Sequence, residues 1–251
     1  MKVFLAGASG VIGRPLVPLL LKAGHQVTGT TRSRDKAAEI EAAGATAVVV
    51  DIYDAAALTE AVRAAKPDVV MHQLTDLPDR NDPAAVAASL PRNMRIRVDG
   101  TRNLVAAAKA SGAKRLIAQS LAFVYADGPE PHAETDPLLP DDGSPSIRGV
   151  LALEAMTLGT PGLDGVVLRY GRLYGPGTWN GDAPPQRSPL HVDAAAQAAL
   201  RALDHGKPGT YNIAEDDGVV SIAKARAELG FDPAFRVALS QAARSHRAAT
   251  L

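Results

Sequence analysis

The sequence predicts an α/β fold in which a doubly wound parallel sheet carries helices on both faces. Two observations lead to this prediction. Short β-branched or aliphatic runs alternate along the chain with Ala-rich stretches whose apolar residues recur three and four positions apart, as strands alternating with helices do. The strand-like runs are apolar throughout instead of alternating in polarity, which indicates burial on both faces of a parallel sheet.

The elements follow from these two patterns in chain order. The apolar runs predict seven strands, at residues 3–6, 26–31, 46–50, 69–73, 115–119, 165–169 and 210–213. The helical spacing between them predicts six helices, at residues 11–23, 35–43, 55–66, about 83–111, 147–158 and 194–203. Two long Pro-, Gly- and Asp-rich segments, 127–145 and 174–189, follow strands and are expected to wall a substrate site. The last residues, 231–251, are expected to form a frayed tail.

Composition excludes several classes of function. The chain has 251 residues, 27 basic and 27 acidic side chains and no cysteine. A net charge of zero provides no positive field for a nucleic-acid backbone, so no nucleic-acid partner is expected. The absence of cysteine excludes disulfides and thiolate metal sites and fits a cytoplasmic protein. No apolar run reaches the roughly 20 residues of a membrane span, so we expect neither membrane insertion nor export.

A glycine-rich turn follows the first predicted strand and opens the first predicted helix. Glycines at Gly7, Gly10 and Gly13 allow a tight turn and a close approach of the backbone to a pyrophosphate, which the helix N-terminus also attracts. A plain Gly-rich turn is the alternative. The predicted contacts of a dinucleotide in this turn are Gly7, Ser9, Gly10, Val11, Ile12 and Gly13.

The spacing of these glycines resembles that of short-chain dehydrogenase/reductases of the extended and atypical classes, which are similar to NAD-dependent epimerases and dehydratases. Further similar motifs are 50–52, 70–74, 100–104, 124–125, 168–177 and 191–193. The resemblance implies a Rossmann-type fold and a carboxylate at Asp51 that accepts from the adenine amino group. It also implies cofactor contacts at Ile52, Gln73, Leu74, Ser120 and Tyr170.

The same resemblance sets an expectation for the division of the chain. Residues 1–165 are expected to form the dinucleotide-binding core. Residues 166–251 are expected to supply the last strands, a reduced C-terminal substrate-binding portion and the tail, within one compact unit. A reduced lid favours a shallow pocket for a bulky hydrophobic substrate, or a pocket that a second copy completes in a homodimer.

The end of the second predicted strand indicates which nucleotide is bound. An acidic residue there would bind the ribose diol of NAD and repel a 2′-phosphate. This chain has Thr31, Arg32 and Arg34 instead, and two guanidinium groups favour the dianionic 2′-phosphate of NADP. The alternative is a solvated basic turn. NADP is therefore the expected cofactor, with NAD second.

The residues that carry proton transfer in the resembled family are missing. Counting back from Glu154 places the family's tyrosine position on Ser146 and its lysine position on Val150, and none of the five tyrosines has a lysine four residues later. The family's hydroxyl position falls on Leu121, beside Ser120. A serine is too weak an acid to replace a tuned phenol unaided. Candidate proton donors are Tyr125, Ser120 and Ser146, with Tyr170 and Tyr174 also near the predicted strand ends.

The histidines do not suggest a metal site, because the six are scattered and no His-x-x-x-His pair is present. His72 is interpreted as a buried, hydrogen-bonded side chain and His191 as loop packing. Asp193 is interpreted as the N-cap or first-turn acid of the helix that follows.

Two functions remain open at this point. The first is an NADP-binding enzyme acting on a small organic molecule, either a reductase with non-standard acid chemistry or a non-redox isomerase, cyclase or dehydratase. The second is an NADP-sensing regulatory or binding protein without turnover. Tyr170 and Tyr174, which are expected to face the pocket, and the long loop 127–145 favour an enzyme, since a sensor needs no walled substrate cleft.

Overall fold

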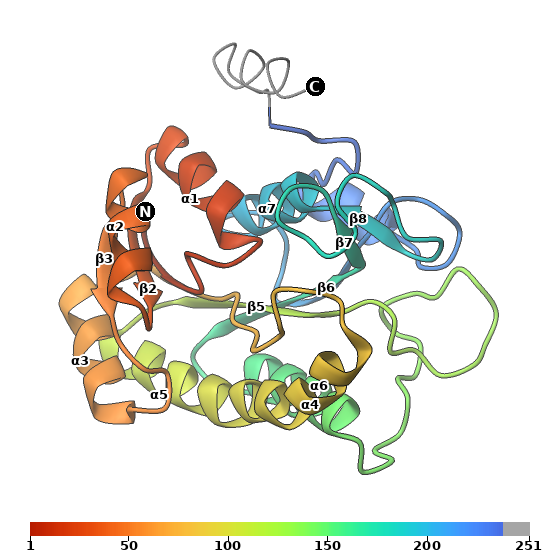
Figure 1. Ribbon diagram of the computed structural model, residues 1–251, viewed down its shortest axis with the longest axis horizontal. Coiled ribbons are helices and arrows are strands. Elements are labelled where there is room, and N and C mark those ends of the chain that lie inside the picture. The colour runs from red at the N-terminus through yellow and green to blue at the C-terminus, as the bar shows by residue number, and fades with distance from the viewer. Residues whose placement is uncertain (238–251) are drawn as a thin grey trace.

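The computed structural model describes residues 1–237 and confirms the doubly wound α/β fold (Figure 1). Seven strands form one sheet in the order β3-β2-β1-β4-β5-β6-β9, and every pairing is parallel. Their bounds are β1 Lys2–Ala6, β2 Gln26–Thr31, β3 Thr46–Val49, β4 Val69–His72, β5 Arg115–Leu121, β6 Asp164–Tyr170 and β9 Gly209–Ile213. The order reverses between β1 and β4, which is the place where such sheets bind ligands.

Helices cover both faces of the sheet. One face carries α1 (Gly13–Lys22), α2 (Arg34–Ala42) and α7 (Val192–Arg201), and the other carries α3 (Ala55–Ala65), α4 (Pro83–Arg95), α5 (Thr101–Ser111) and α6 (Pro145–Leu158). Figure 1 shows α4, α5 and α6 together on the face opposite α1 and α7. Each layer buries its own hydrophobic cluster against the sheet.

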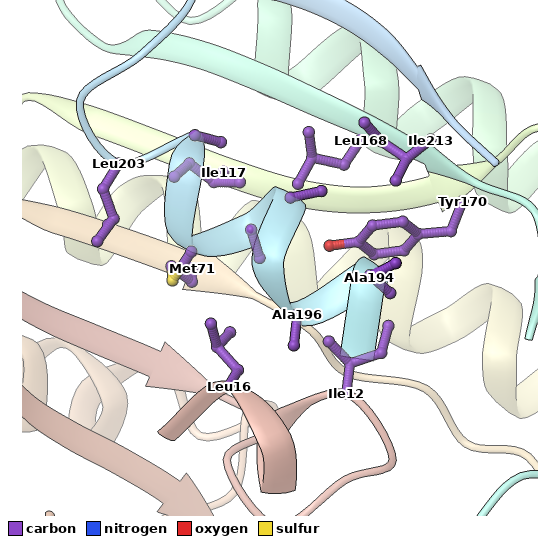
Figure 2. Packing of buried hydrophobic residues seen from close by; sticks show 14 of the residues in the cluster. Ile12, Leu16, Met71, Ile117, Leu168, Tyr170, Ala194, Ala196, Leu203 and Ile213 are labelled. Atoms are coloured by element: carbon purple, nitrogen blue, oxygen red, sulfur yellow. The ribbon is translucent and has the colours of Figure 1, made fainter. Parts of the chain in front are cut away.

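The first of these clusters packs around α7. Its alanines at 194, 195, 196, 198 and 199 are all fully buried, and their small side chains let the helix lie close to both α1 and the sheet. Figure 2 shows Ile12 and Leu16 from the α1 side and Leu168 and Ile213 from the sheet meeting this helix.

The predicted helix from about 83 to 111 is confirmed in its bounds, but it is not regular along its whole length. The structure divides it into α4, a π-helical turn η1 (Ile96–Gly100) and α5. A π-turn inserts an extra residue into the helix and is common at functional sites, yet it leaves the apolar spacing on both sides nearly helical. Periodicity alone therefore could not reveal it.

Two short strands that were not predicted lie at the two ends of the loop 174–189. β7 (Arg172–Tyr174) and β8 (Pro189–His191) pair in parallel as a separate two-stranded sheet. The helix α7 then starts at Val192, with the His191 side chain as its cap and Asp193 as the acid of its first turn. A second π-turn, η2 (Ala225–Leu229), follows β9. Every helix among residues 1–237 is too short or too polar to cross a bilayer.

The expected frayed tail is also wrong for residues 231–237. Phe231 is 3% exposed and belongs to the main core. Arg236 donates to the Tyr174 hydroxyl at 2.8 Å and to Glu215 at 3.1 Å, while the Val237 N–H donates to Asp193 at 3.0 Å. These contacts fix the chain against β7 and α7. The rest of the predicted tail, residues 238–251, lies outside the described residues.

Candidate functional site

The glycine-rich turn between β1 and α1 has the geometry of a phosphate cradle. Gly7 has a φ of +96°, and a Cβ there would lie 2.6 Å from the Gln73 carbonyl oxygen. A Cβ on Gly13 would lie 2.2 Å from the Gly7 carbonyl oxygen, and the Gly10 N–H donates to the same oxygen at 3.0 Å. No side chain larger than hydrogen fits at Gly7 or Gly13, so the turn depends on these glycines.

The start of α1 is open to an anion. Ile12 occupies its N-cap position without any side-chain cap, and no acidic residue stands in the first turn. The Ile12 side chain is buried in the core, whereas Ser9 is half-buried and Val11 is exposed. An uncapped helix N-terminus beside a glycine turn is suited to a pyrophosphate, so the residues present fit a dinucleotide.

The end of β2 lies beside this turn. Thr31 is buried, and its hydroxyl oxygen accepts from the Ser33 N–H at 3.2 Å and from the Ser9 hydroxyl at 3.5 Å. Arg32 and Arg34 are exposed, and neither side chain forms a hydrogen bond or an ion pair within residues 1–237. Both guanidinium groups are therefore available to a ligand at this edge.

The predicted adenine-binding segment follows β3. Asp51 is exposed, and its carboxylate accepts from the Tyr53 N–H at 3.0 Å. Ile52 is buried, and its carbonyl oxygen accepts from the Asn103 amide at 2.9 Å, which ties the segment to α5. The Asp51 carboxylate thus lies on the surface, while the hydrogen bond from Asn103 on α5 holds the segment in place.

Residues at the end of β4 connect the site to the core. The Leu74 carbonyl oxygen accepts from the Gln119 amide at 3.0 Å, and Gln73 donates to the Tyr170 hydroxyl at 3.3 Å. Tyr170 is 3% exposed, and Figure 2 shows its ring beside Ala194 in the core around α7. Burial raises the pKa of Tyr170. The expectation of a pocket-facing Tyr170 is wrong, because the side chain points from the sheet into the α7 layer.

A layer of buried polar side chains lies between the sheet and α6. Arg169 on β6 makes a bidentate ion pair with Glu154 on α6, and Ser120 on β5 donates to the same carboxylate at 2.6 Å. His72 at the end of β4 faces the same layer and is fully buried. Burial and the nearby Arg97 guanidinium lower the pKa of His72 to about 4, so it is neutral near pH 7, in agreement with its interpretation as a buried histidine.

Tyr125 anchors the loop that follows β5. Its hydroxyl donates to the Asn212 side chain at 2.6 Å and accepts from Arg169 at 2.8 Å, and its ring stacks on His132. Burial raises the pKa of the phenol. A proton donor needs the opposite shift and a free O–H, so this geometry fits a structural tyrosine better than a catalytic one.

Both long loops do meet at one pocket, of about 280 Å³. The Arg172 guanidinium lies 4.3 Å from the centre of the Phe123 ring at its rim, and Arg187 pairs with Glu130. The pocket thus combines an aromatic ring with charged side chains of both signs, because Asp127 and Glu130 line it together with the two arginines. Its lining residues are 122, 123, 125–128, 130, 132, 172, 187, 188 and 219.

Comparison with known proteins agrees with the fold. Residues 3–185 match the model of the NAD dependent epimerase/dehydratase family. The chain belongs to this family. It is 40% identical over 241 residues to the 3-diazoavenalumate denitrifying reductase of a Streptomyces species, covering 86% of this chain and 77% of that protein. It is 29% identical over 253 residues to the UDP-N-acetyl-alpha-D-glucosaminuronate decarboxylase of Bacillus cytotoxicus, covering 86% and 75%.

Solved structures of similar proteins support the same assignment. The Bordetella bronchiseptica enzyme WbmH in complex with NAD⁺ has a TM-score of 0.68 and 26% identity, over 87% of this chain and 77% of that one. The UDP-glucose 4-epimerase of Thermotoga maritima, with UDP-glucose, has a TM-score of 0.78 at 19% identity, over 94% of both chains, and so shows the fold alone. The geometry of the glycine turn fits a dinucleotide, and the WbmH structure contains NAD⁺.

This member of the epimerase/dehydratase family has no acid and base pair at the start of α6. Ser146 is half-buried in the first turn of the helix and forms no hydrogen bond within residues 1–237. Val150, one turn later, is 1% exposed and packs with Val124 and Ile147 in a small apolar cluster. Ser120 is 2% exposed, and its proton is directed at Glu154. The Tyr125 and Ser120 hydroxyls are thus engaged in hydrogen bonds, and the Ser146 hydroxyl has no hydrogen-bond partner within residues 1–237 that would activate it.

Sequence reasoning missed Phe123, Arg172 and Arg97. Phe123 and Arg172 lie in segments that carry no periodic pattern. Arg97 had a signal, because it shares the inward-facing helical spacing of Thr101 and Leu104, where a charged residue is unexpected. A charge at such a position is either paired or functional.

Proposed function

We propose that this chain is an NADP-dependent reductase whose substrate is a small organic molecule that accepts a hydride without needing a proton from the protein. The observation that carries the proposal is the start of α6, where Ser146 and Val150 offer neither a phenol nor an ammonium group. The substrate class that fits best is an aromatic diazo compound, which is reduced with loss of its nitrogen.

The chemistry of the substrate explains why the acid and base pair is dispensable. When bound, the reduced nicotinamide supplies a hydride. A ketone that accepts a hydride becomes an alkoxide, which must take a proton from a donor of matched pKa. An aryl diazonium ion that accepts a hydride ends as the arene and N₂: the C–N bond breaks, a C–H bond forms with the two electrons of the hydride, and no proton is taken up.

The comparisons support this substrate class. The relative that is 40% identical along most of this chain is named as a denitrifying reductase of a diazo compound. The aromatic and cationic rim of the pocket, formed by Phe123 and Arg172, is consistent with a flat aromatic substrate. The tied hydroxyls of Tyr125 and Ser120 are consistent with a reaction that needs no proton donor.

The preference for NADP rests on the edge beside β2. Arg32 and Arg34 are exposed without partners, and no carboxylate stands at the end of the strand to bind a ribose diol. The solved relatives in complex with a nucleotide contain NAD, so this preference belongs to the particular residues of this chain.

The test uses benzenediazonium and acetophenone as paired probes with NADPH or NADH. We expect consumption of NADPH with benzenediazonium, one N₂ and one benzene for each NADPH, no proton uptake, and no turnover of acetophenone. The Gly13→Val variant, which should not bind the nucleotide, measures the rate of direct reaction between the probe and NADPH in solution. Turnover of the ketone with proton uptake, or a diazonium rate equal to that of the variant, would refute the proposal. Nucleotide binding with neither reaction would favour a sensor.

A further inference from the structure

Arg97 is a buried cation without a partner. It lies in the π-turn η1 between α4 and α5 and is 4% exposed. Its side chain packs against α6, where a Cβ on Gly149 would come within 3.2 Å of its Cδ. The guanidinium forms no hydrogen bond or ion pair within residues 1–237, and its Nε is fully enclosed without an acceptor. An unpaired guanidinium in such a place is costly, which calls for a functional explanation.

The surrounding charges do not neutralise Arg97. The Glu154 carboxylate attracts the Arg97 guanidinium electrostatically. Both of its oxygens already accept from Arg169, and one of them also accepts from Ser120. His72 is neutral. The Glu134 carboxylate accepts from the Asn212 N–H and acts on Tyr125. Two guanidinium groups thus share one buried carboxylate, which leaves an excess positive charge in this layer.

Burial does not remove this charge. It lowers the pKa of Arg97 to about 10, so the side chain is still protonated at neutral pH. Only Nε is enclosed; the terminal nitrogens are not among the fully buried, unpaired atoms and so keep some access to solvent. The terminal nitrogens, which form the planar fork, are therefore the part of the side chain that a ligand can reach.

The position of Arg97 connects it to the site. It adjoins His72, which ends β4, and its neighbour Gly149 is followed directly by Val150 in α6. The carboxyl ends of β4 and β5 are the edge at which parallel sheets of this type bind ligands. Arg97 is therefore a cation beside the segment of α6 in which Val150 stands at the expected lysine position.

We propose that Arg97 is a substrate-binding residue whose guanidinium holds a carboxylate of the substrate. Guanidinium and carboxylate match in shape and can form two parallel charge-assisted hydrogen bonds, and the carboxylate would neutralise the excess charge of the layer. The inference deepens the proposed function, because it adds an aromatic carboxylate to the substrate class. It does not depend on the kind of reduction that follows.

The first test compares cinnamate with cinnamamide, its neutral analogue, by calorimetry on the full chain saturated with NADP⁺. We expect wild type to bind cinnamate about tenfold or more tightly than cinnamamide. Arg97→Gln should remove this preference and leave cinnamamide binding unchanged, while Arg97→Lys should retain part of it. Arg80→Gln, which removes an exposed arginine, is the matched control.

Two outcomes of this binding test would overturn the inference. The first is an equal affinity of wild type for cinnamate and cinnamamide. The second is a preference that survives in Arg97→Gln but disappears in Arg172→Gln, because the carboxylate would then bind at the pocket rim instead. Failure of diazonium turnover with the carboxylate preference intact would refute the proposed reaction and leave the role of Arg97 standing.

A second readout separates binding from a purely structural role. An unpaired buried charge opposes folding of the ligand-free protein, so Arg97→Met should unfold at the same temperature as wild type or higher. Cinnamate should raise the unfolding temperature of wild type but not that of Arg97→Met. A marked drop in the unfolding temperature of ligand-free Arg97→Met would show that Arg97 is structural and would contradict the proposal.

Discussion

Arg169 and Glu154 form a buried bidentate ion pair between β6 and α6, with Nε–Oε1 and Nη2–Oε2 distances of 3.0 and 2.7 Å. Their side chains are only 6% and 8% exposed. Ser120 donates to Glu154, and Tyr125 accepts from Arg169, so the pair joins the ends of β5 and β6 to the helix above them. This pair helps to hold α6 in its position against the carboxyl ends of β5 and β6.

Glu154→Gln should therefore destabilise the protein strongly. The substitution leaves Arg169 buried without its counter-charge, which typically costs about 3 to 5 kcal/mol. Urea unfolding followed by circular dichroism measures the change. Glu39→Gln is the control, because its pair with Arg14 is 57% exposed on both sides and should change stability by less than about 0.5 kcal/mol. Similar values for the two variants would contradict a structural role of the buried pair.

Arg32→Ala should weaken NADP binding about 10- to 100-fold and leave NAD binding nearly unchanged, because it removes a charge-assisted contact to the 2′-phosphate. Isothermal titration of both nucleotides measures this, with Lys36→Ala as a nearby cationic control. Wild type with equal affinity for NAD and NADP would disprove the assignment of the basic edge.

Gly13→Ala should abolish nucleotide binding and weaken the fold, since the added Cβ would lie 2.2 Å from the Gly7 carbonyl oxygen. Calorimetry with NADP and thermal unfolding give the two readouts. Gly128→Ala is the matched control, because its nearest neighbour would stand at an ordinary 3.5 Å. Retention of wild-type affinity in Gly13→Ala would rule out this turn as the binding site.

Ser146→Ala and Tyr125→Phe should each keep turnover within about tenfold, whereas loss of a true general acid costs about 10² to 10⁴. Tyr125→Phe should instead lower the free energy of unfolding by about 1 to 3 kcal/mol, because its partners Asn212 and Arg169 lose a hydrogen bond. Initial rates and urea unfolding distinguish the two effects. A rate loss of 10² or more in a variant that still folds and binds NADP would identify that residue as the proton donor after all.

Stability should fall as the pH drops through the titration range of His72. Its pKa is lowered from 6.5 to about 4, so the unfolded chain binds more protons than the native one between these values. The stabilisation is fully present above pH 6.5 and is lost toward pH 4, a change of about 3 kcal/mol. Unfolding free energies at pH ~7, ~5.5 and ~4.5 should fall more steeply for wild type than for His72→Gln. Parallel slopes would show that His72 does not titrate in this way.

Much of the fold could be predicted from local patterns. All seven strands of the large sheet lie within two residues of the runs that predict them. The signal is clearest for central strands such as β1 and β4, because a strand buried on both faces needs an apolar stretch. The glycine turn was equally clear, since Gly7, Gly10 and Gly13 have a spacing that only a tight turn requires. β7 and β8 could not be predicted, because three-residue strands have no period of their own.

The candidate site was predictable in part. The positions of Arg32 and Arg34 could be predicted because both residues closely follow the predicted strand β2 and so lie at its carboxyl end. The loops 127–145 and 174–189 were expected to wall a pocket, and residues from both line one. Their particular contributions, such as the Arg172 guanidinium over the Phe123 ring, depend on how two irregular segments meet.

The sequence by itself determined the order of the elements, the glycine turn and the absence of a Tyr-x-x-x-Lys pair. Only the tertiary structure decided where the polar side chains point. Tyr170 enters the core, Ser120 faces Glu154, and Arg97 is left without a partner. The physical reason is that a strand or helix buried on all sides shows no polar face, so its residues carry no local sign of the neighbour that each will meet.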